Sequence, residues 1–179
     1  EVGRGMKAGR KLTRRTSLLI AMCIACAGIS VRTAQASPYY VTVAGLGGEP
    51  DYEQRFTGLA NDLDKLFKAS GGDAHVFTFT GSDATKARLT DTLAQIAREA
   101  KPDDAFTLIL IGHGAYDGEV YKFNLAGPDI SGDELAVLCN RIAAKRQLIV
   151  NTTSASGGSI GALQRAGRVV IAATKSGTE

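Results

Sequence analysis

Short apolar runs alternate with longer amphipathic segments along most of this chain of 179 residues. Short runs that are mainly apolar, or that alternate with polar residues, are typical of strands, and they occur at Tyr39–Ala44, Ala74–Thr80, Phe106–Ile111, Leu148–Asn151 and Val169–Ala173. Apolar residues recur at helical spacing in about Tyr52–Ala69 and again from Leu89 to Ala100, which predicts two amphipathic helices.

Further elements follow from local signals. Ser131 and Glu134 form a capping-box pattern that predicts a third helix, running to about Ala144. The segment Gly118–Leu125 predicts a short extension or a hairpin. Strands that alternate with helices of this length predict an α/β fold, with a mainly parallel sheet sandwiched between helices.

Three segments with glycine or polar residues directly follow predicted strands. They are the turn Gly45–Gly48, the pair His113-Gly114, and the stretch Thr152–Gly158. Parallel sheets bring functional groups together at the carboxyl ends of their strands. These segments are therefore expected to share one rim of the sheet, and that rim is the predicted functional site.

His113 is the stronger of the two histidine candidates. It stands between two glycines at the end of an apolar run, a position that packing explains poorly, and Gly114 leaves a backbone N–H approachable, as an oxyanion donor must be. His75 begins a predicted strand without polar neighbours and is expected to be a half-exposed strand residue. Two separate histidines without paired acidic residues predict no metal site.

Ser154 lies in the segment Ser-Ala-Ser-Gly-Gly, which is similar to the nucleophile elbow of hydrolases. In that fold the catalytic histidine follows the serine along the chain, whereas both histidines here precede Ser154. The glycine turn after the first strand is not a dinucleotide fingerprint, because Pro50 stands where the last glycine is needed. No cofactor is therefore expected.

Five segments together carry a resemblance to a known family: Val43-Ala-Gly-Leu-Gly-Gly-Glu-Pro-Asp-Tyr52, Ile111-Gly-His-Gly114, Phe123-Asn-Leu-Ala-Gly-Pro-Asp-Ile-Ser131, Ile149-Val-Asn-Thr-Thr-Ser-Ala-Ser-Gly-Gly158 and Ile171-Ala-Ala-Thr-Lys-Ser-Gly177. From about residue 40 onward, the chain resembles the legumain-like and caspase-like cysteine peptidases. The resemblance implies a caspase-like fold and the site of an endopeptidase.

The resemblance also implies a role for each matching position. His113 corresponds to the general base, and Ser154 stands at the nucleophile position, which is a cysteine in the relatives. Gly114 and the amide of residue 154 correspond to the oxyanion hole. Arg55 is a candidate for lining a pocket that takes an acidic side chain.

The chain departs from the family at positions close to the chemistry. Gly47 stands where legumains carry an asparagine that orients the histidine, and Thr152 stands where relatives carry an acidic residue. A cysteine has a pKa near 8.5 and supplies some thiolate unaided, whereas a serine needs a closely held base that a third group orients.

These departures favour a catalytically impaired homologue that binds a peptide or a protein. Two other functions remain open at this point. One is an active hydrolase that uses Ser154 with His113, and the other is an assembly module that uses the same fold.

Residues 1–36 are predicted to be an N-terminal extension and a secretory signal peptide, which leaves 37–179 as the peptidase-like domain. A basic region of five Lys and Arg residues, from Lys7 to Arg15, precedes the apolar stretch Leu18–Ile29 and the small-x-small site Ala34-Gln35-Ala36. The apolar stretch is shorter than the roughly 20 residues of a spanning helix. We therefore expect export to the periplasm or the outside by the general secretory or the twin-arginine route, and no membrane span in the mature chain.

The leader also accounts for the basic character of the chain. It holds seven of the 21 Lys and Arg residues and one of the 18 Asp and Glu residues, so the remainder has a net charge of about −3 and gives no indication of nucleic acid as a partner. Cys139 is the one cysteine beyond the leader, and its place on an apolar stripe predicts a buried side chain. Because the chain stops at Glu179 soon after an apolar run, we expect a C-terminal truncation.

Overall fold

The computed structural model describes residues 36–177, which form an α/β unit around a five-stranded parallel sheet. The spatial order of the strands is β2-β1-β3-β7-β8, and every neighbouring pair is parallel. The strand bounds are Pro38–Ala44 (β1), His75–Phe79 (β2), Ala105–Ile111 (β3), Arg146–Asn151 (β7) and Arg168–Ala172 (β8). The predicted α/β class and its strands are therefore confirmed.

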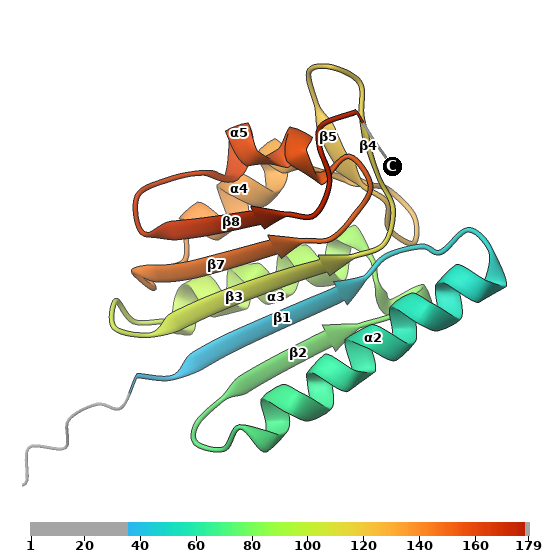
Figure 1. Cartoon of the computed structure of the whole chain (residues 1–179). Coiled ribbons are helices and arrows are strands. Elements are labelled where there is room, and N and C mark those ends of the chain that lie inside the picture. Colours follow the sequence, from blue (N-terminus) through green and yellow to red (C-terminus); the bar gives the residue numbers. More distant parts are fainter. Residues whose placement is uncertain (1–35, 178–179) are drawn as a thin grey trace, which may run out of the picture. The chain divides into compact units, whose positions relative to one another are not determined.

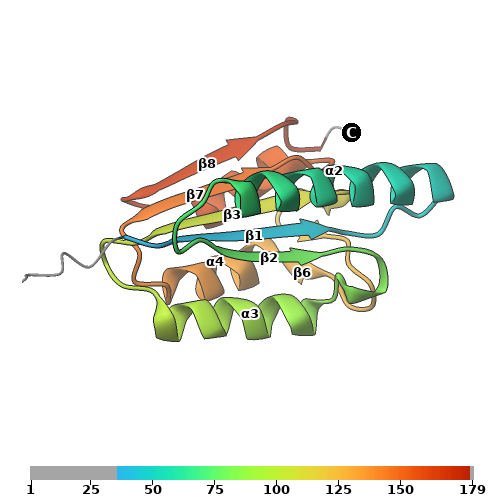
Figure 2. The ribbon, with the colours of Figure 1, turned by 90° about the horizontal axis from the view of Figure 1, so that it is seen from below.

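Helices lie on both faces of the sheet. Helix α2 (Pro50–Ala69) lies on one face, and helices α3 (Lys86–Glu99) and α4 (Gly132–Asn140) lie on the other (Figures 1 and 2). Short turns complete the unit, namely η1 (Gly81–Asp83), η2 (Ser156–Ser159) and α5 (Ile160–Leu163). The parallel strands place all their carboxyl ends at one edge of the sheet, where the candidate site was predicted.

The larger hydrophobic core lies between the sheet and helices α3 and α4. Val41, Leu108 and Ile149 point into it from three neighbouring strands, and Leu93 and Leu135 come from the two helices. All five side chains are fully buried. Because side chains alternate along a strand, every second residue of β1 and β3 belongs to this core, and β7 contributes Ile149.

The core under α2 is smaller. Phe56 and Leu63 of α2 pack with Ile109 of β3, and helix α2 contacts β1 and β2. The same face of β8 carries Val169 and Ile171, which are 61% and 50% exposed. This face of the sheet is therefore covered at the β2 side and open to solvent at β8 within the described residues.

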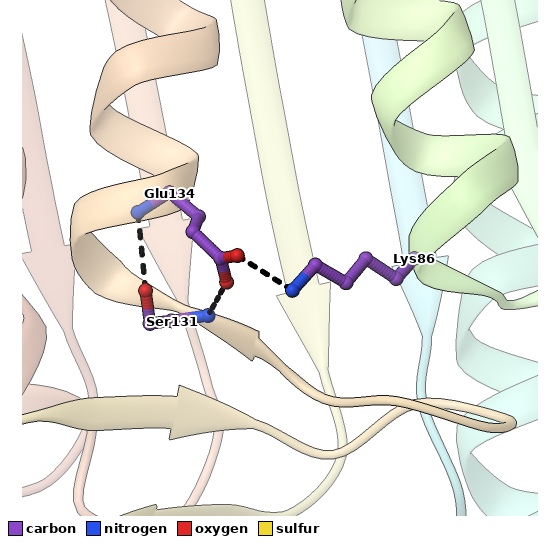
Figure 3. Close-up of polar contacts among 3 residues, drawn as sticks. All are labelled: Lys86, Ser131 and Glu134. Carbon is purple, nitrogen blue, oxygen red and sulfur yellow. Dashed lines mark hydrogen bonds and ion pairs between the residues drawn. The ribbon is translucent and has the colours of Figure 1, made fainter.

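Helix α4 begins with the predicted capping box, which also ties it to α3 (Figure 3). The hydroxyl of Ser131 accepts from the backbone N–H of Glu134 at 3.1 Å, and the Glu134 carboxylate accepts from the N–H of Ser131 at 2.9 Å. Its other oxygen accepts from the ammonium of Lys86 at 2.6 Å. These contacts lower the pKa of Glu134, the ion pair with Lys86 most strongly.

Helix α4 ends at Asn140, earlier than the predicted end near Ala144. The reason lies in a later strand. The side-chain amide of Gln147 in β7 donates to the carbonyl oxygens of Ile142 at 3.1 Å and Ala144 at 3.0 Å. These carbonyls are satisfied by a buried glutamine, so the chain leaves the helix without an unpaired backbone group.

A small antiparallel sheet follows β3 directly. It consists of β4 (Gly114–Tyr116), β5 (Tyr121–Phe123) and β6 (Ile130–Ser131). Of the two alternatives predicted for Gly118–Leu125, the structure has the hairpin, but its first strand begins earlier, at Gly114. The Asp117 carboxylate accepts from the N–H groups of Glu119 at 2.9 Å and Val120 at 2.7 Å in the β4–β5 turn. These two hydrogen bonds lower the pKa of Asp117, and the bond from Val120 has the larger effect. The hairpin holds β4 next to the carboxyl end of the main sheet.

The predicted signal peptide lies, apart from Ala36, outside the described residues, and so does the chain end to which the predicted truncation refers. Within the described part of the chain, no helix combines the length and the apolar character needed to cross a bilayer.

Candidate functional site

His113 and Ser154 meet at the carboxyl edge of the sheet. His113 follows β3 and Ser154 follows β7, and these strands are neighbours in the sheet. The His113 Nδ1 and the Ser154 Oγ are 3.5 Å apart, and both side chains are partly exposed. The predicted meeting of these side chains is confirmed, at a distance at the outer limit of a hydrogen bond.

A buried polar network anchors the chain just before Ser154. The Asn151 side-chain oxygen accepts from the Thr153 hydroxyl at 2.8 Å and from the Tyr121 hydroxyl at 3.3 Å, and its amide nitrogen donates to the Ser159 hydroxyl at 3.0 Å. Burial raises the pKa of Tyr121, so its hydroxyl keeps its proton as a donor. The network fixes the segment before Ser154 through buried hydrogen bonds, and Ser154 itself lies partly exposed at the rim.

The turn after Ser154 is held from two directions. Ala155 has a φ of 53°, the one positive value at a non-glycine among the described residues. This conformation costs roughly 1–2 kcal/mol for a residue with a side chain. Ser156 then donates its N–H to the Thr174 hydroxyl at 2.9 Å, and Thr174 donates its N–H to the Ser156 hydroxyl at 3.0 Å. The loop after β8 therefore supports the loop that carries Ser154.

Gly114 fits closely against the Ser154 loop. A Cβ at position 114 would lie 2.8 Å from the Ser154 carbonyl oxygen, which only glycine avoids. The N–H of Asn124 donates to the His113 carbonyl at 3.1 Å, so Gly114 and Phe123 form a non-hydrogen-bonded pair of the antiparallel ladder. The N–H of Gly114 consequently points away from β5.

The backbone N–H of Ser154 has no acceptor among the described residues. Both N–H groups that the resemblance assigns to an oxyanion hole are therefore unused by the β4–β5 ladder and by the loops. Such preorganised donors are what stabilisation of a developing oxyanion requires.

Two aromatic rings from α2 flank the His113 imidazole. Tyr52 and Phe56 lie edge-on to it, with ring centroids 5.1 and 5.3 Å away. Their spacing of four residues predicts a helix and no more, because a core-facing stripe has the same spacing. Their position in the first turns after the Gly45–Gly48 loop was the signal that could have placed them at the rim.

Position 47 does not supply an orienting group for His113. The N–H of Gly47 donates to the Glu53 carboxylate at 2.8 Å, and a Cβ at this position would overlap the backbone nitrogen of Glu53. An asparagine side chain therefore cannot be accommodated there without a shift of α2. Within residues 36–177, the imidazole hydrogen-bonds to Ser154 and contacts the two aromatic rings, and it has no hydrogen bond to a carboxylate or a carbonyl oxygen.

A comparison with models of protein families finds no match, and neither does a comparison with curated proteins. Among solved structures, the chain is similar to the crystal structure of protein GSU0716 from Geobacter sulfurreducens, with 17% sequence identity and a TM-score of 0.53. The similarity covers 66% of this chain and 50% of that protein, so the chain spans about half of its length. At this identity the likeness supports the α/β fold and carries no function.

The remaining predicted site residues lie close to the rim. Arg55 is exposed on α2, and its guanidinium carbon is 5.9 Å from the centroid of the Tyr52 ring, which itself contacts His113. Thr152, where the resemblance predicts an acidic residue, donates its hydroxyl to the Leu110 carbonyl at 2.8 Å. The Tyr52 ring therefore lies between Arg55 and the imidazole, whereas the Thr152 hydroxyl is bound to the backbone of β3.

Other reactive side chains lie away from this site. Cys139 is buried in the larger core, where burial raises its pKa to about 12, so the prediction of a buried apolar residue is confirmed. His75 is an exposed strand residue that stacks on Tyr39 with ring centroids 4.5 Å apart. The described residues contain no cluster of three or more His, Cys, Asp or Glu side chains that could hold a metal ion.

Proposed function

We propose that this protein is an exported, catalytically impaired relative of the caspase-like and legumain-like peptidases that binds a peptide or protein segment. The observation that carries the proposal is the environment of His113. The imidazole faces Ser154 at 3.5 Å, but its other neighbours are the rings of Tyr52 and Phe56. The site has the positions of a peptidase without the group that would orient its base.

The aromatic environment matters because serine and cysteine make different demands on a base. A serine hydroxyl loses its proton only to a base that a third, polar group holds and that stabilises the imidazolium as it forms. Aromatic ring edges restrict the motion of the His113 ring without accepting its second N–H. Ser154 is therefore held in the nucleophile position while remaining a neutral hydroxyl.

The same features suit the binding of an extended peptide. The N–H groups of Gly114 and Ser154 are free to donate to a carbonyl oxygen at the rim. Arg55 adds an exposed positive charge beside Tyr52, which favours a peptide with an acidic side chain. Export rests on the predicted leader in residues 1–36, and a polypeptide partner in the periplasm or outside the cell is consistent with that location.

An active serine hydrolase is the second candidate. It is favoured by the 3.5 Å approach of His113 to Ser154 together with the two available N–H donors. Catalytic hydrogen bonds are often long without substrate and shorten when it binds. In this case Ser154 would attack the carbonyl carbon while His113 takes the hydroxyl proton, and His113 would then give that proton to the leaving amine as the C–N bond breaks.

A fluorophosphonate probe distinguishes the two candidates. We expect no covalent labelling of the wild-type protein, and none of its Ser154→Ala variant, because the serine stays protonated. Labelling of the wild type that disappears in Ser154→Ala would replace the proposal with the hydrolase.

Binding is tested separately by fluorescence anisotropy with an acidic and a basic peptide library, and Arg55→Gln should weaken the binding of acidic peptides selectively.

Replacing Ser154 by cysteine tests whether the cleft retains peptidase geometry. In a Cys139→Ala background, we expect Ser154→Cys to react with iodoacetamide about tenfold faster at pH 7 than a cysteine at Ser82, an exposed serine in η1. The reason is that His113 lies within reach of the sulfur and stabilises its thiolate. Equal rates at the two positions would show that the imidazole does not act on residue 154.

A further inference from the structure

Two arginines lie three residues apart on the turn that leads into β8. Arg165 and Arg168 flank a tight turn in which the Arg168 N–H donates to the Arg165 carbonyl at 3.1 Å and Gly167 has a φ of 80°. The turn lies at the amino end of β8, whereas His113 and Ser154 lie at the carboxyl ends of β3 and β7 (Figure 1). The two regions therefore lie at opposite ends of the parallel strands.

Both guanidinium groups converge on one neutral atom. The side-chain oxygen of Asn140 accepts from Arg165 at 2.9 Å and from Arg168 at 3.0 Å. Arg168 is 8% exposed. Its pKa is lowered, mainly by burial, and the charge of Arg165 acts in the same direction. Two like charges are therefore held together around an amide oxygen that neutralises neither.

The structural role of Arg168 accounts for one of these charges. Its guanidinium also donates to the Gln147 side chain at 2.9 Å and to the Leu163 carbonyl at 2.8 Å, so it ties α4, α5 and β7 together. The last carbonyls of a helix attract cations, and Arg168 donates to that of Leu163 at the end of α5, whereas at α4 it contacts the Asn140 side chain. Arg165 is exposed and donates to the Asn140 side-chain oxygen and, at 3.5 Å, to the Asn140 backbone carbonyl, so it places a second positive charge at the end of α4.

A cavity of about 200 Å³ opens beside this pair. Arg165 and Lys145 line it together with Gly167 and the buried Gln147. Among residues 36–177, no Asp or Glu side chain pairs with Arg165, Arg168 or Lys145. Because the described chain is otherwise not basic, a specific site is indicated by two cations that line a cavity without an acidic partner, one of which, Arg165, shares the Asn140 oxygen with Arg168.

We infer that this cavity binds a multivalent oxyanion of the phosphate or sulfate type, either free or carried on a larger molecule. Arg165 and Lys145 contact the anion from the cavity wall, and Arg168 supplies charge from behind. Guanidinium groups pair with such oxygens through charge-assisted hydrogen bonds, and an anion relieves the repulsion between the two arginines. This site is separate from the rim that carries the proposed peptide-binding function.

Thermal unfolding and calorimetric titration of the protein with sodium phosphate, at an ionic strength kept constant with sodium chloride, test the site. We expect phosphate to raise the Tm of the wild type and to bind stoichiometrically. Arg165→Gln should weaken binding about tenfold, because it removes a charge-assisted hydrogen bond. Lys145→Gln provides a second variant at an exposed position, and circular dichroism checks that both variants are folded.

Lys65→Gln is the matched control, because it removes one exposed positive charge from α2, a helix that does not line the cavity. Equal binding by this control and by Arg165→Gln, or no rise in Tm of the wild type, would overturn the inference. Glycerol phosphate forms a second arm of the titration. If it binds as well as inorganic phosphate, the natural ligand carries the phosphate as an ester, and if it fails while inorganic phosphate binds, the site takes the free ion.

Discussion

At the scale of single residues, the candidate site depends on side chains that support Ser154 as much as on Ser154 itself. The Tyr121 and Thr153 hydroxyls lie 2.5 Å apart, and each also lies within hydrogen-bond distance of the Asn151 side-chain oxygen, at the buried side of the loop. His113 and Ser154 were predictable, because glycines and small polar residues after apolar runs stand out in the sequence. Tyr121 and Asn151 were not, because a polar residue in a strand shows its partner only after folding.

Tyr121→Phe is predicted to lower the free energy of unfolding by about 1–2 kcal/mol, because it leaves buried oxygens of Asn151 and Thr153 with one donor fewer. Urea denaturation measures the loss. Tyr116→Phe is the matched control, since its hydroxyl donates to the Gly118 carbonyl at an exposed position and should cost less than about 0.5 kcal/mol. Equal losses in the two variants would contradict a special role for the buried network.

At the scale of elements, bounds set by local signals could be predicted from the sequence, whereas bounds set by long-range contacts could not. The predicted strands agree with β1, β2, β3, β7 and β8 to within two residues at each end, because apolar runs in a parallel sheet are nearly continuous. The start of α4 was also predictable, since both partners of its capping box are three residues apart. Its end at Asn140 was not, because Gln147 in the next strand decides it.

Glu134→Gln is predicted to lower stability at neutral pH and not at low pH. The pKa of Glu134 is lowered in the folded protein, so its carboxylate stabilises the fold above the unfolded value of about 4.3, and this contribution is lost as the pH falls through the folded value. At pH 7 we expect a loss of about 0.5 kcal/mol, because solvent screens a half-exposed pair. The loss should vanish at lower pH.

Urea denaturation of Glu134→Gln at pH 7 and at pH 3 measures this difference. Glu119→Gln serves as the control, since this exposed side chain has no polar partner among the described residues. A loss in Glu134→Gln that stays constant between the two pH values would show that the ion pair with Lys86 contributes nothing to stability.

At the scale of the whole unit, the two faces of the sheet differ in how well they are covered. Ile149 is fully buried between the sheet and helices α3 and α4, whereas Ile171 on the neighbouring strand is 50% exposed on the face that carries α2. The sequence does not reveal this asymmetry, because both residues belong to equally apolar runs.

Ile149→Ala is therefore predicted to lower the free energy of unfolding by about 2–5 kcal/mol, the cost of a cavity in a packed core. The same change at Ile171 should cost less than about 1 kcal/mol, since much of this side chain is already in contact with water. Thermal and urea unfolding of the two variants provide the measurement. A large loss at Ile171 would mean that this face is covered in solution, by a segment or partner beyond residues 36–177.

The sequence by itself determined the α/β class, the strands, the capping box of α4 and the position of His113 and Ser154 after neighbouring strands. These properties follow from periodicity and from signals that lie a few residues apart. Only the tertiary structure decided what surrounds the imidazole, which helix covers which strands, and that Arg165 and Arg168 share one acceptor. Those properties arise from contacts between residues far apart in the chain, and no local pattern specifies which partner a side chain meets once the sheet has formed.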